Sequence, residues 1–324
     1  MKAAVLDQLG KSPTYKDFPL PEIQNDEQLL LRVKAASVKN LDKLRASGNH
    51  YASHKDLPTV VGTDGVGILE DGSQVYAQGI TGMLAEEAVI NKNSYTLIPE
   101  KLDLHIAAAL PNAVLGAALP LKIRGEIKPG QNVLINGATG VTGQLAVQLA
   151  KYYGAKCIIA TGRNRDILEK TKTLGADKTV SLKQNDEAIV KQVKEINNET
   201  PIDLIIDYLW GKPIKLIISA MSGSGMNSYM HKVRIVTVGS MAGESIDLTS
   251  GTLRSSAIEL MGSGFGSLSE NDLEHFNQVI LPEMFQLAAD EKLKIDIVVD
   301  TIRNIEKLWP QKIESGKRLV VSIN

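Results

Sequence analysis

Cysteine is almost absent from this sequence. Cys157 is the one cysteine among 324 residues, so the chain cannot form an internal disulfide or a cysteine-rich zinc lobe. It lies in the apolar run 156–160, which is typical of a buried strand. We therefore interpret Cys157 as a packing residue and not as a reactive thiol.

The sequence also lacks an excess of charge of either sign. It has 36 basic and 37 acidic residues, a net charge of −1, and no basic block or stripe. We therefore expect no nucleic-acid partner. The hydrophobic share of 43% and the charged share of 23% are those of a soluble globular protein. A chain of this length is expected to form two domains.

Long uninterrupted apolar runs are missing as well. The first residues, MKAAVLDQLG, do not have the basic and then apolar pattern of a signal peptide. The most apolar stretch, 106–121, is interrupted by Pro111, Asn112 and Pro120, and it is shorter than the ~20 residues that cross a bilayer. The sequence therefore predicts no membrane span and a cytoplasmic protein.

The first ~110 residues have a β-rich and irregular pattern. Residues 29–38 (LLLRVKAASV) have strand composition, and 65–69 lead through the turn Glu70-Asp71-Gly72 into 74–76, as in a hairpin. The final stretch 316–323 again has strand composition. We expect it to return to the first domain.

From Val133 onward, short apolar runs alternate with amphipathic helical patterns. The predicted strands are Val133–Asn136, Lys156–Ala160, Lys178–Leu182, Asp203–Asp207 and Val233–Val238. Between them, apolar residues recur four apart, as at Val141, Leu145 and Leu149. This alternation predicts a parallel sheet covered on both faces, an α/β doubly wound fold.

Three glycines spaced three apart follow the first of these strands. They lie in the segment Gly137, Ala138, Thr139, Gly140, Val141, Thr142 and Gly143. Small residues here allow a tight turn and close backbone approach to a pyrophosphate at a helix N-terminus. Because the turn lies between a strand and a helix, we predict a dinucleotide site; a glycine-rich turn without a ligand is the alternative.

The residues after the second strand bear on the choice of nucleotide. An NAD site usually has a carboxylate about 20 residues beyond the glycines, but this position holds Arg163, within Gly162, Arg163, Asn164 and Arg165. Two arginines and an asparagine can hold a 2′-phosphate, and the glycine leaves room for it. We therefore predict NADP(H). The alternative is a solvated basic helix start with Asn164 as its N-cap.

Together these motifs resemble the medium-chain dehydrogenase/reductase superfamily, in its zinc-free quinone oxidoreductase branch. The motifs are 62–67 (GTDGVG), 128–130 (KPG), the glycine turn, 174–177 (LGAD) and 315–317 (SGK), and the resemblance covers essentially the whole chain. It implies a GroES-like β-rich catalytic domain of residues 1–115 and 291–324, and a Rossmann NADP(H)-binding domain of residues 116–290. It also implies hydride delivery from NADPH across a cleft between the domains.

Zinc members of that superfamily bind their catalytic metal with two cysteines and a histidine. The resemblance places these positions at or near Lys39, Thr63 and Asn112, so we expect no metal. A second possibility, His50 with His54, falls in a turn-like segment and is not favoured as a metal site.

Without zinc, the resemblance implies a substrate that accepts hydride readily, such as a quinone or an activated enone. Lys39 and Asn40 are the candidate catalytic residues. In one reading the Lys39 ammonium polarises a carbonyl oxygen, and in the other it is paired with Asp42 or Asp64. Backbone groups of Val238, Gly239, Ser240 and Gly264 are candidates for contacting the nicotinamide carboxamide; ordinary turns are the alternative. We interpret Asp207 and Tyr208 as peripheral.

Two other functions stay open at this point. One is a 2-alkenal or enoyl double-bond reductase, which needs a proton donor that the sequence does not identify. The other is a non-catalytic NADPH-binding sensor, because fold alone does not fix function. Relatives in this superfamily often form homodimers through edge strands of the nucleotide-binding sheet, and the apolar stretch 257–261 is the candidate edge.

Overall fold

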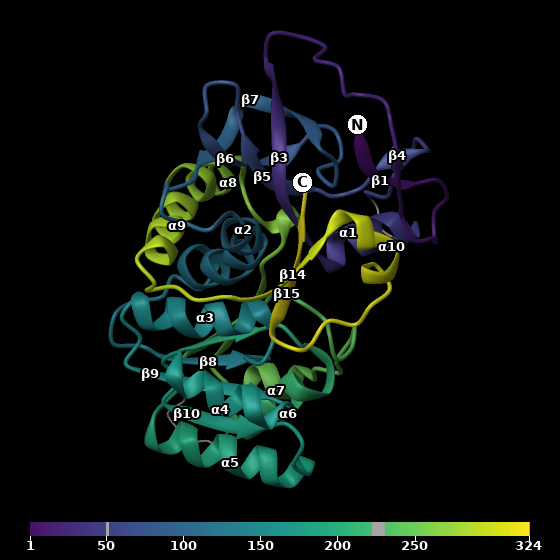
Figure 1. Ribbon diagram of the computed structural model, residues 1–324. Helices are drawn as coiled ribbons and strands as arrows, with labels where there is room; N and C mark the ends of the chain where they lie inside the picture. The colour runs from purple at the N-terminus through teal and green to yellow at the C-terminus, as the bar shows by residue number, and fades with distance from the viewer. Residues whose placement is uncertain (50–51, 222–230, 324) are drawn as a thin grey trace. The chain divides into compact units, whose positions relative to one another are not determined.

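The computed structural model describes residues 1–49, 52–221 and 231–323 (Figure 1). The chain forms two compact units: Met1–Asn112 with Glu274–Asn324, and Ala113–Leu273. Residues 274–290 thus belong with the first unit, whereas the sequence placed them in the nucleotide-binding domain. Packing explains the difference, because Phe285 is completely buried and its ring meets that of Tyr76 edge-on, with centroids 6.3 Å apart.

The first unit is built on strands that pair antiparallel, except that β14 and β15 are parallel. They are β1 (Lys2–Leu6), β2 (Thr14–Asp17), β3 (Gln28–Val38), β4 (Thr59–Val60), β5 (Asp64–Ile68), β6 (Gln74–Gly79), β7 (Glu87–Leu97), β14 (Asp296–Thr301) and β15 (Lys317–Ser322). A small sheet has the order β2-β1-β4, and a six-stranded sheet has the order β14-β15-β3-β5-β6-β7, with β3 also pairing with β7. The helices and helical turns are α1 (Asn40–Ser47), η3 (Phe276–Ile280), α9 (Leu281–Ala289), η4 (Ile302–Asn304) and α10 (Ile305–Leu308).

Several predicted features of this unit are confirmed. β3 covers the predicted strand 29–38, and β5 and β6 form the predicted hairpin, with Gly67 opposite Val75. The last strand, β15, lies between β14 and β3, so the end of the chain does return to the sheet of the first residues. In Figure 1 the yellow β15 runs beside the purple β3.

The second unit is a doubly wound parallel sheet. Its strands are β8 (Asn132–Asn136), β9 (Cys157–Gly162), β10 (Lys178–Ser181), β11 (Leu204–Asp207), β12 (Val233–Thr237) and β13 (Ile258–Gly262). Its helices and turns are α3 (Val141–Tyr152), α4 (Arg165–Thr173), α5 (Asp186–Glu199), α6 (Gly211–Met221), α7 (Ser250–Arg254) and η2 (Phe265–Ser267), and α8 (Glu270–His275) spans the division between the units. The five predicted strands are all present.

The order of this sheet is β10-β9-β8-β11-β12-β13, and every pairing is parallel. This is the strand order of dinucleotide-binding Rossmann folds. The apolar sides of α5 and α6 pack on one face, where Ile189 and Ile217 join strand residues such as Leu134 and Ile205. Residues that alternate with these, such as Val133, are also completely buried, so both faces are covered as predicted.

The apolar stretch near residue 110 lies in one helix, which its prolines do not end. Pro111 lies inside α2 (Leu104–Leu119), and Pro120 begins the π-helical turn η1 (Pro120–Arg124) that continues it. The continuous helix has 21 residues, so length and composition alone would let it cross a membrane. However, 67% of its most apolar window is buried inside the protein, which is the behaviour of a core helix.

Candidate nucleotide-binding and catalytic sites

The glycine turn lies where the direction of strand order reverses in the parallel sheet. On one side of β8 the next strands in the sheet are β9 and β10. On its other side they are β11, β12 and β13. The carboxyl ends of β8 and β11 therefore flank a topological switch point, with Asn136 directly beside Asp207 in the register. Ligands of open α/β sheets bind at such points, at the carboxyl ends of the strands.

A different structural feature explains why each of the three positions in the turn is a glycine. Gly137 has φ of 95°, a conformation that favours glycine. A Cβ at Gly143 would lie 2.4 Å from the Gly137 carbonyl oxygen, so α3 can lie this close to the turn only without a side chain there. At Gly140 a Cβ would meet only the Gly137 oxygen, at 3.7 Å. Gly140 thus leaves open space beside the backbone.

The N-terminus of α3 faces this open space without a side-chain cap. Gly140 is the N-cap residue, and no side chain accepts a hydrogen bond from the first helical turn. Among the described residues, no acceptor is found for the backbone N–H groups of Val141, Thr142 and Gly143. Free N–H groups and the positive end of the helix dipole make this an anion-binding position. The turn therefore fits the pyrophosphate of a dinucleotide.

Gly162, at the end of β9, has a role that the sequence did not predict. A Cβ at this position would lie 2.2 Å from Cγ2 of Thr139. The glycine therefore makes room for the threonine side chain of the turn itself. Packing against Thr139 thus explains why position 162 is a glycine, and a bound phosphate is not needed to explain it.

The basic segment that follows β9 is exposed at its two arginines. Asn164 caps α4, because its Oδ1 accepts the N–H groups of Asp166 at 3.1 Å and Ile167 at 3.2 Å. Arg163 and Arg165 are exposed, and within the described part of the chain neither forms an ion pair. Arg165 is the first residue of α4, where the helix dipole disfavours a cation. An anionic ligand at this position would remove that conflict.

Many polar groups in the turns after β12 and β13 form hydrogen bonds with other groups of the protein. The N–H groups of Val238 and Gly239 point to the Asp207 carbonyl oxygen, at 2.7 and 3.4 Å. The Ser240 hydroxyl donates to Glu244 Oε1 at 2.6 Å. Gly264 donates its N–H to Ser267 Oγ at 2.9 Å. These N–H groups are therefore committed, and a contact of these turns with a cofactor stays a prediction.

In the first unit, Lys39 is buried in a cluster of charged groups. Its side chain is 2% exposed, although it lies at the N-cap of α1. The Nζ atom lies 2.7 Å from Asp64 Oδ1, 3.1 Å from Asp42 Oδ2 and 2.9 Å from the Ser37 carbonyl oxygen. An ammonium has three N–H donors, and three acceptors surround this one. The interpretation of Lys39 as an aspartate-paired lysine matches this geometry.

The neighbouring groups complete this network. Asp42 Oδ1 accepts both the Thr63 N–H at 2.9 Å and the Thr63 hydroxyl at 2.6 Å, and Oδ2 accepts the Lys39 N–H at 2.9 Å. The hydroxyl of Tyr76 donates to Asp64 Oδ2 at 3.1 Å. Every carboxylate oxygen of the cluster therefore has a partner, as buried charges require.

Burial and pairing have opposite effects on the ionisation of this cluster. Burial alone would lower the pKa of Lys39, but the charges of Asp42 and Asp64 outweigh it, and the pKa is raised above its ordinary value. Burial alone would raise the pKa of Asp42, but the charge of Lys39 and the bond from Thr63 outweigh it, and the pKa is lowered. Both groups are held in their charged forms.

The positions that correspond to zinc ligands do not fit a zinc ion. Lys39 is an ammonium with no free lone pair, and Thr63 is bonded to Asp42. Asn112 Oδ1 accepts from Arg318 Nη2 at 3.4 Å. No group of three or more His, Cys, Asp or Glu side chains suited to a metal occurs among the described residues. His50 lies outside the described residues, so its pairing with His54 is not described.

Asn40, the other catalytic candidate, differs from Lys39 in its surroundings. It is the first residue of α1, its side chain is exposed, and no hydrogen-bond partner of that side chain is found in the described part of the chain. Its amide is therefore available to a ligand in a way that the Lys39 ammonium is not.

The sequence analysis overlooked a buried polar group in the second unit. Asn136, Thr161 and Asp207 are each completely buried, on the neighbouring strands β8, β9 and β11. The available signal was a polar residue at or near the end of each of three apolar runs. The interpretation of Asp207 as peripheral did not use this signal.

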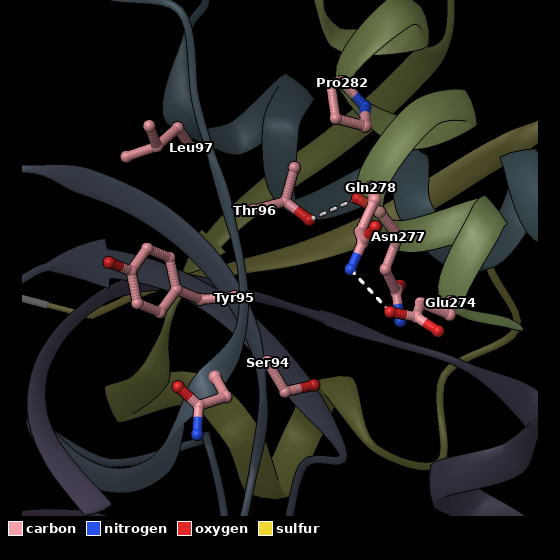
Figure 2. Close-up of a pocket in the computed structure, with 9 residues that line it drawn as sticks. Ser94, Tyr95, Thr96, Leu97, Glu274, Asn277, Gln278 and Pro282 are labelled. Atoms are coloured by element: carbon pink, nitrogen blue, oxygen red, sulfur yellow. Dashed lines mark hydrogen bonds between the residues drawn. The ribbon is translucent and has the colours of Figure 1, made fainter.

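An open pocket of about 670 Å³ lies in the first unit, between β7 and the segment 274–282 (Figure 2). Thr96 donates to the Asn277 carbonyl oxygen at 3.3 Å, and Gln278 donates to Glu274 at 2.8 Å. None of the predicted site residues lines this pocket. It is therefore distinct from both sites described above.

Comparison with known proteins agrees with this fold. The sequence model of a family described as Zinc-binding dehydrogenase matches residues 141–281. An NADPH-dependent alkenal/one oxidoreductase of Arabidopsis thaliana is 35% identical over 201 residues, which are 55% of this chain and 51% of that protein, so the chain matches about half the length of this relative. A probable NADPH-dependent quinone reductase of Emericella nidulans is 27% identical, covering 95% of this chain and 96% of that protein.

Among solved structures, the quinone oxidoreductase of Thermus thermophilus, whose complex with NADPH is also known, superimposes with a TM-score of 0.78. It is 24% identical, and the match covers 99% of this chain and 100% of that one. At this level of identity, the match shows that the two chains share a fold.

Proposed function

We propose that this protein is an NADPH-dependent oxidoreductase that transfers hydride to quinones without zinc. The observation that carries the proposal is the uncapped N-terminus of α3 at the switch point of the sheet, with two exposed arginines following the next strand. The names of relatives that use NADPH support the same choice of cofactor.

In this proposal the second unit binds the cofactor. The N–H groups at the start of α3 hold the pyrophosphate, and open space at Gly140 permits its close approach. Arg163 and Arg165 hold the 2′-phosphate by charge-assisted hydrogen bonds. NAD has no such phosphate, so these arginines would gain nothing from it.

The reaction is a two-electron reduction. When bound, NADPH would supply the hydride; a quinone would take it up together with a proton from solvent or a side chain, which would give NADP⁺ and a hydroquinone. The negative charge that develops on the quinone oxygen is delocalised, so a few hydrogen-bond donors are enough to stabilise it. We assign Asn40 as one such donor, because its amide is exposed and unpaired among the described residues. Lys39 contributes by holding the charged cluster that begins α1.

Reduction of an activated enone is the second candidate. It is favoured by the 35% identity to an alkenal/one oxidoreductase, a higher value than for the quinone reductase relatives named above. Such a reaction adds hydride to the β-carbon and a proton to the α-carbon. A quinone and an enone assayed with the same enzyme preparation decide between the two substrates.

The cofactor proposal is tested by titrating the protein with NADPH and NADH and following cofactor fluorescence. Tighter binding of NADPH is expected, and Arg163→Ala should weaken NADPH binding about 10-fold or more while leaving NADH binding within about 2-fold. Arg254→Ala, which removes an exposed arginine on α7, is the matched control and should change neither. Equal binding of the two cofactors by the wild type would refute the assignment of the arginines, and binding without oxidation by either acceptor would favour a sensor.

We also propose that β13 pairs with its copy in a homodimer. β13 pairs with β12 on one side and ends the sheet, and Leu260 on it is 40% exposed. Light scattering at micromolar concentration should give the mass of a dimer, and a monomer would contradict this proposal.

A further inference from the structure

A chain of hydrogen bonds links the end of β11 to the glycine turn. Asn136 Nδ2 donates to Asp207 Oδ1 at 2.7 Å, and the Thr161 hydroxyl donates to Asn136 Oδ1 at 2.6 Å. The backbone N–H of Gly137 then donates to the Thr161 hydroxyl oxygen at 3.2 Å. All three side chains are completely buried, so no water competes for these bonds.

The direction of every bond in this chain is set by Asp207. Burial raises the pKa of Asp207, but the N–H groups of Leu209 and Trp210 donate to its two oxygens and favour the ionised form. An ionised carboxylate only accepts hydrogen bonds, so Asn136 turns its NH₂ group toward Asp207. The Asn136 oxygen then faces Thr161 and accepts its hydroxyl proton. The Thr161 oxygen is left as an acceptor for the N–H of Gly137, the first residue of the turn. One arrangement of donors and acceptors satisfies all of these groups.

Asp207 also orders the segment that follows its own strand. Oδ1 accepts the Leu209 N–H at 3.0 Å, and Oδ2 accepts the Trp210 N–H at 3.1 Å. Trp210 has φ of 53°, a strained conformation for a residue other than glycine, which these bonds help to hold. The side chain of Leu209 lies against Gly137, since a Cβ there would be 3.0 Å from Leu209 Cγ. One carboxylate thus fixes the loops on both sides of the switch point.

We propose that Asp207, acting through Asn136 and Thr161, is a positioning residue for the NADPH-binding turn. It holds Gly137 in the conformation that directs the start of α3 at the pyrophosphate, without itself touching the cofactor. This inference rests on the proposed function and deepens it. A network with three buried polar side chains is costly in a parallel sheet whose neighbouring strand positions are apolar, and a positioning role accounts for its presence at this end of the strands.

Substitutions at Thr161 test the link between the carboxylate and the turn. Thr161→Val removes the hydroxyl with little change in shape and should weaken NADPH binding about 10-fold, which is about 1.4 kcal/mol, with turnover at saturating NADPH within about 2-fold of the wild type. Thr161→Ser keeps the hydroxyl and should restore the affinity. Thr171→Val is the matched control, because the hydroxyl of this completely buried threonine donates to the Leu168 carbonyl oxygen within α4.

Hydrogen exchange gives a readout that is independent of cofactor binding. Peptides covering residues 137–143 should exchange faster in Thr161→Val than in the wild type or in Thr171→Val. Wild-type NADPH affinity in Thr161→Val, or failure of Thr161→Ser to restore it, would overturn the inference. If the wild type binds neither dinucleotide, the proposed function fails, and unchanged exchange of residues 137–143 in Thr161→Val would then overturn the positioning role as well.

Discussion

Replacement of Lys39 by methionine gives the most informative test of the charged cluster. The substitution keeps much of the side-chain volume but leaves Asp42 and Asp64 buried without their shared cation. At an effective dielectric constant of about 20, charges 2.7 and 3.1 Å apart attract by about 5–6 kcal/mol per pair. Part of the lost attraction is offset, because the variant no longer has to bury the Lys39 ammonium. Loss of one partner of a buried pair costs about 3–5 kcal/mol in measured cases, which we take as the expected net effect.

The pH dependence follows from the direction of the pKa shifts. In the wild type the pKa of Asp42 is lowered, so its stabilising contribution is present above its ordinary acid range and is lost as the pH falls through the lowered value. Without Lys39 the effect of burial remains and raises that pKa. The variant should then be least stable near neutral pH and should recover as the pH falls through the raised value. The deficit relative to the wild type is therefore expected to shrink as the pH falls below neutral.

Urea unfolding followed by circular dichroism measures both effects. Lys43→Met is the matched control, because Lys43 lies on the same helix, has a single 3.4 Å bond to the Gln311 carbonyl oxygen and has no carboxylate partner among the described residues. Lys43→Met should lower the free energy of unfolding by less than about 1 kcal/mol. If Lys39→Met unfolds at the wild-type urea concentration, the reasoning about the cluster is wrong. If it remains folded near pH 5, keeps its NADPH affinity and turns over quinone at the wild-type rate, Lys39 has no part in the reaction.

The remaining predictions concern the glycine turn and Tyr76. Gly143→Ala should prevent the second unit from folding normally, because its Cβ would lie 2.4 Å from the Gly137 oxygen, whereas Gly140→Ala should fold with wild-type stability and lose most NADPH affinity. Thermal unfolding and cofactor fluorescence separate the two, and retained NADPH binding in Gly140→Ala would contradict the placement of the pyrophosphate. Tyr76→Phe should lower the free energy of unfolding by about 1.5–3 kcal/mol, because it removes a buried bond to a carboxylate. Tyr95→Phe, at an exposed site of the same sheet, should have no measurable effect, and equal results for the two tyrosines would argue against the buried bond.

The elements that could be predicted are those with a local signal. The strands of the second unit are short apolar runs, and residues four apart, such as Leu145 and Leu149, marked the buried side of α3. The glycine turn was identified because its spacing follows from the chemistry of a phosphate-binding turn. Asn164 was recognised as an N-cap candidate for the same kind of local reason, and its two backbone bonds confirm this.

The features that were wrong or overlooked depend on distant partners or on packing. Pro111 and Pro120 were read as interruptions of the apolar stretch 106–121, but Pro111 lies inside α2 and Pro120 begins the turn that continues this helix. Gly162 was attributed to a ligand, but the atom that occupies its free space belongs to Thr139, 23 positions earlier in the sequence. The partners of Asp207 lie on two other strands, and no periodicity in the sequence reveals that Asn136 and Thr161 are in register with each other.

The position of β15 has a consequence for the order in which the protein can form. This strand is not at a margin: it is hydrogen-bonded to β14 on one side and to β3 on the other. During synthesis β3 gains this neighbour only after β15, which comes much later in the chain, has been made. All six strands of the parallel sheet are made in the interval. The parallel sheet can therefore form before the six-stranded sheet of the first unit is complete.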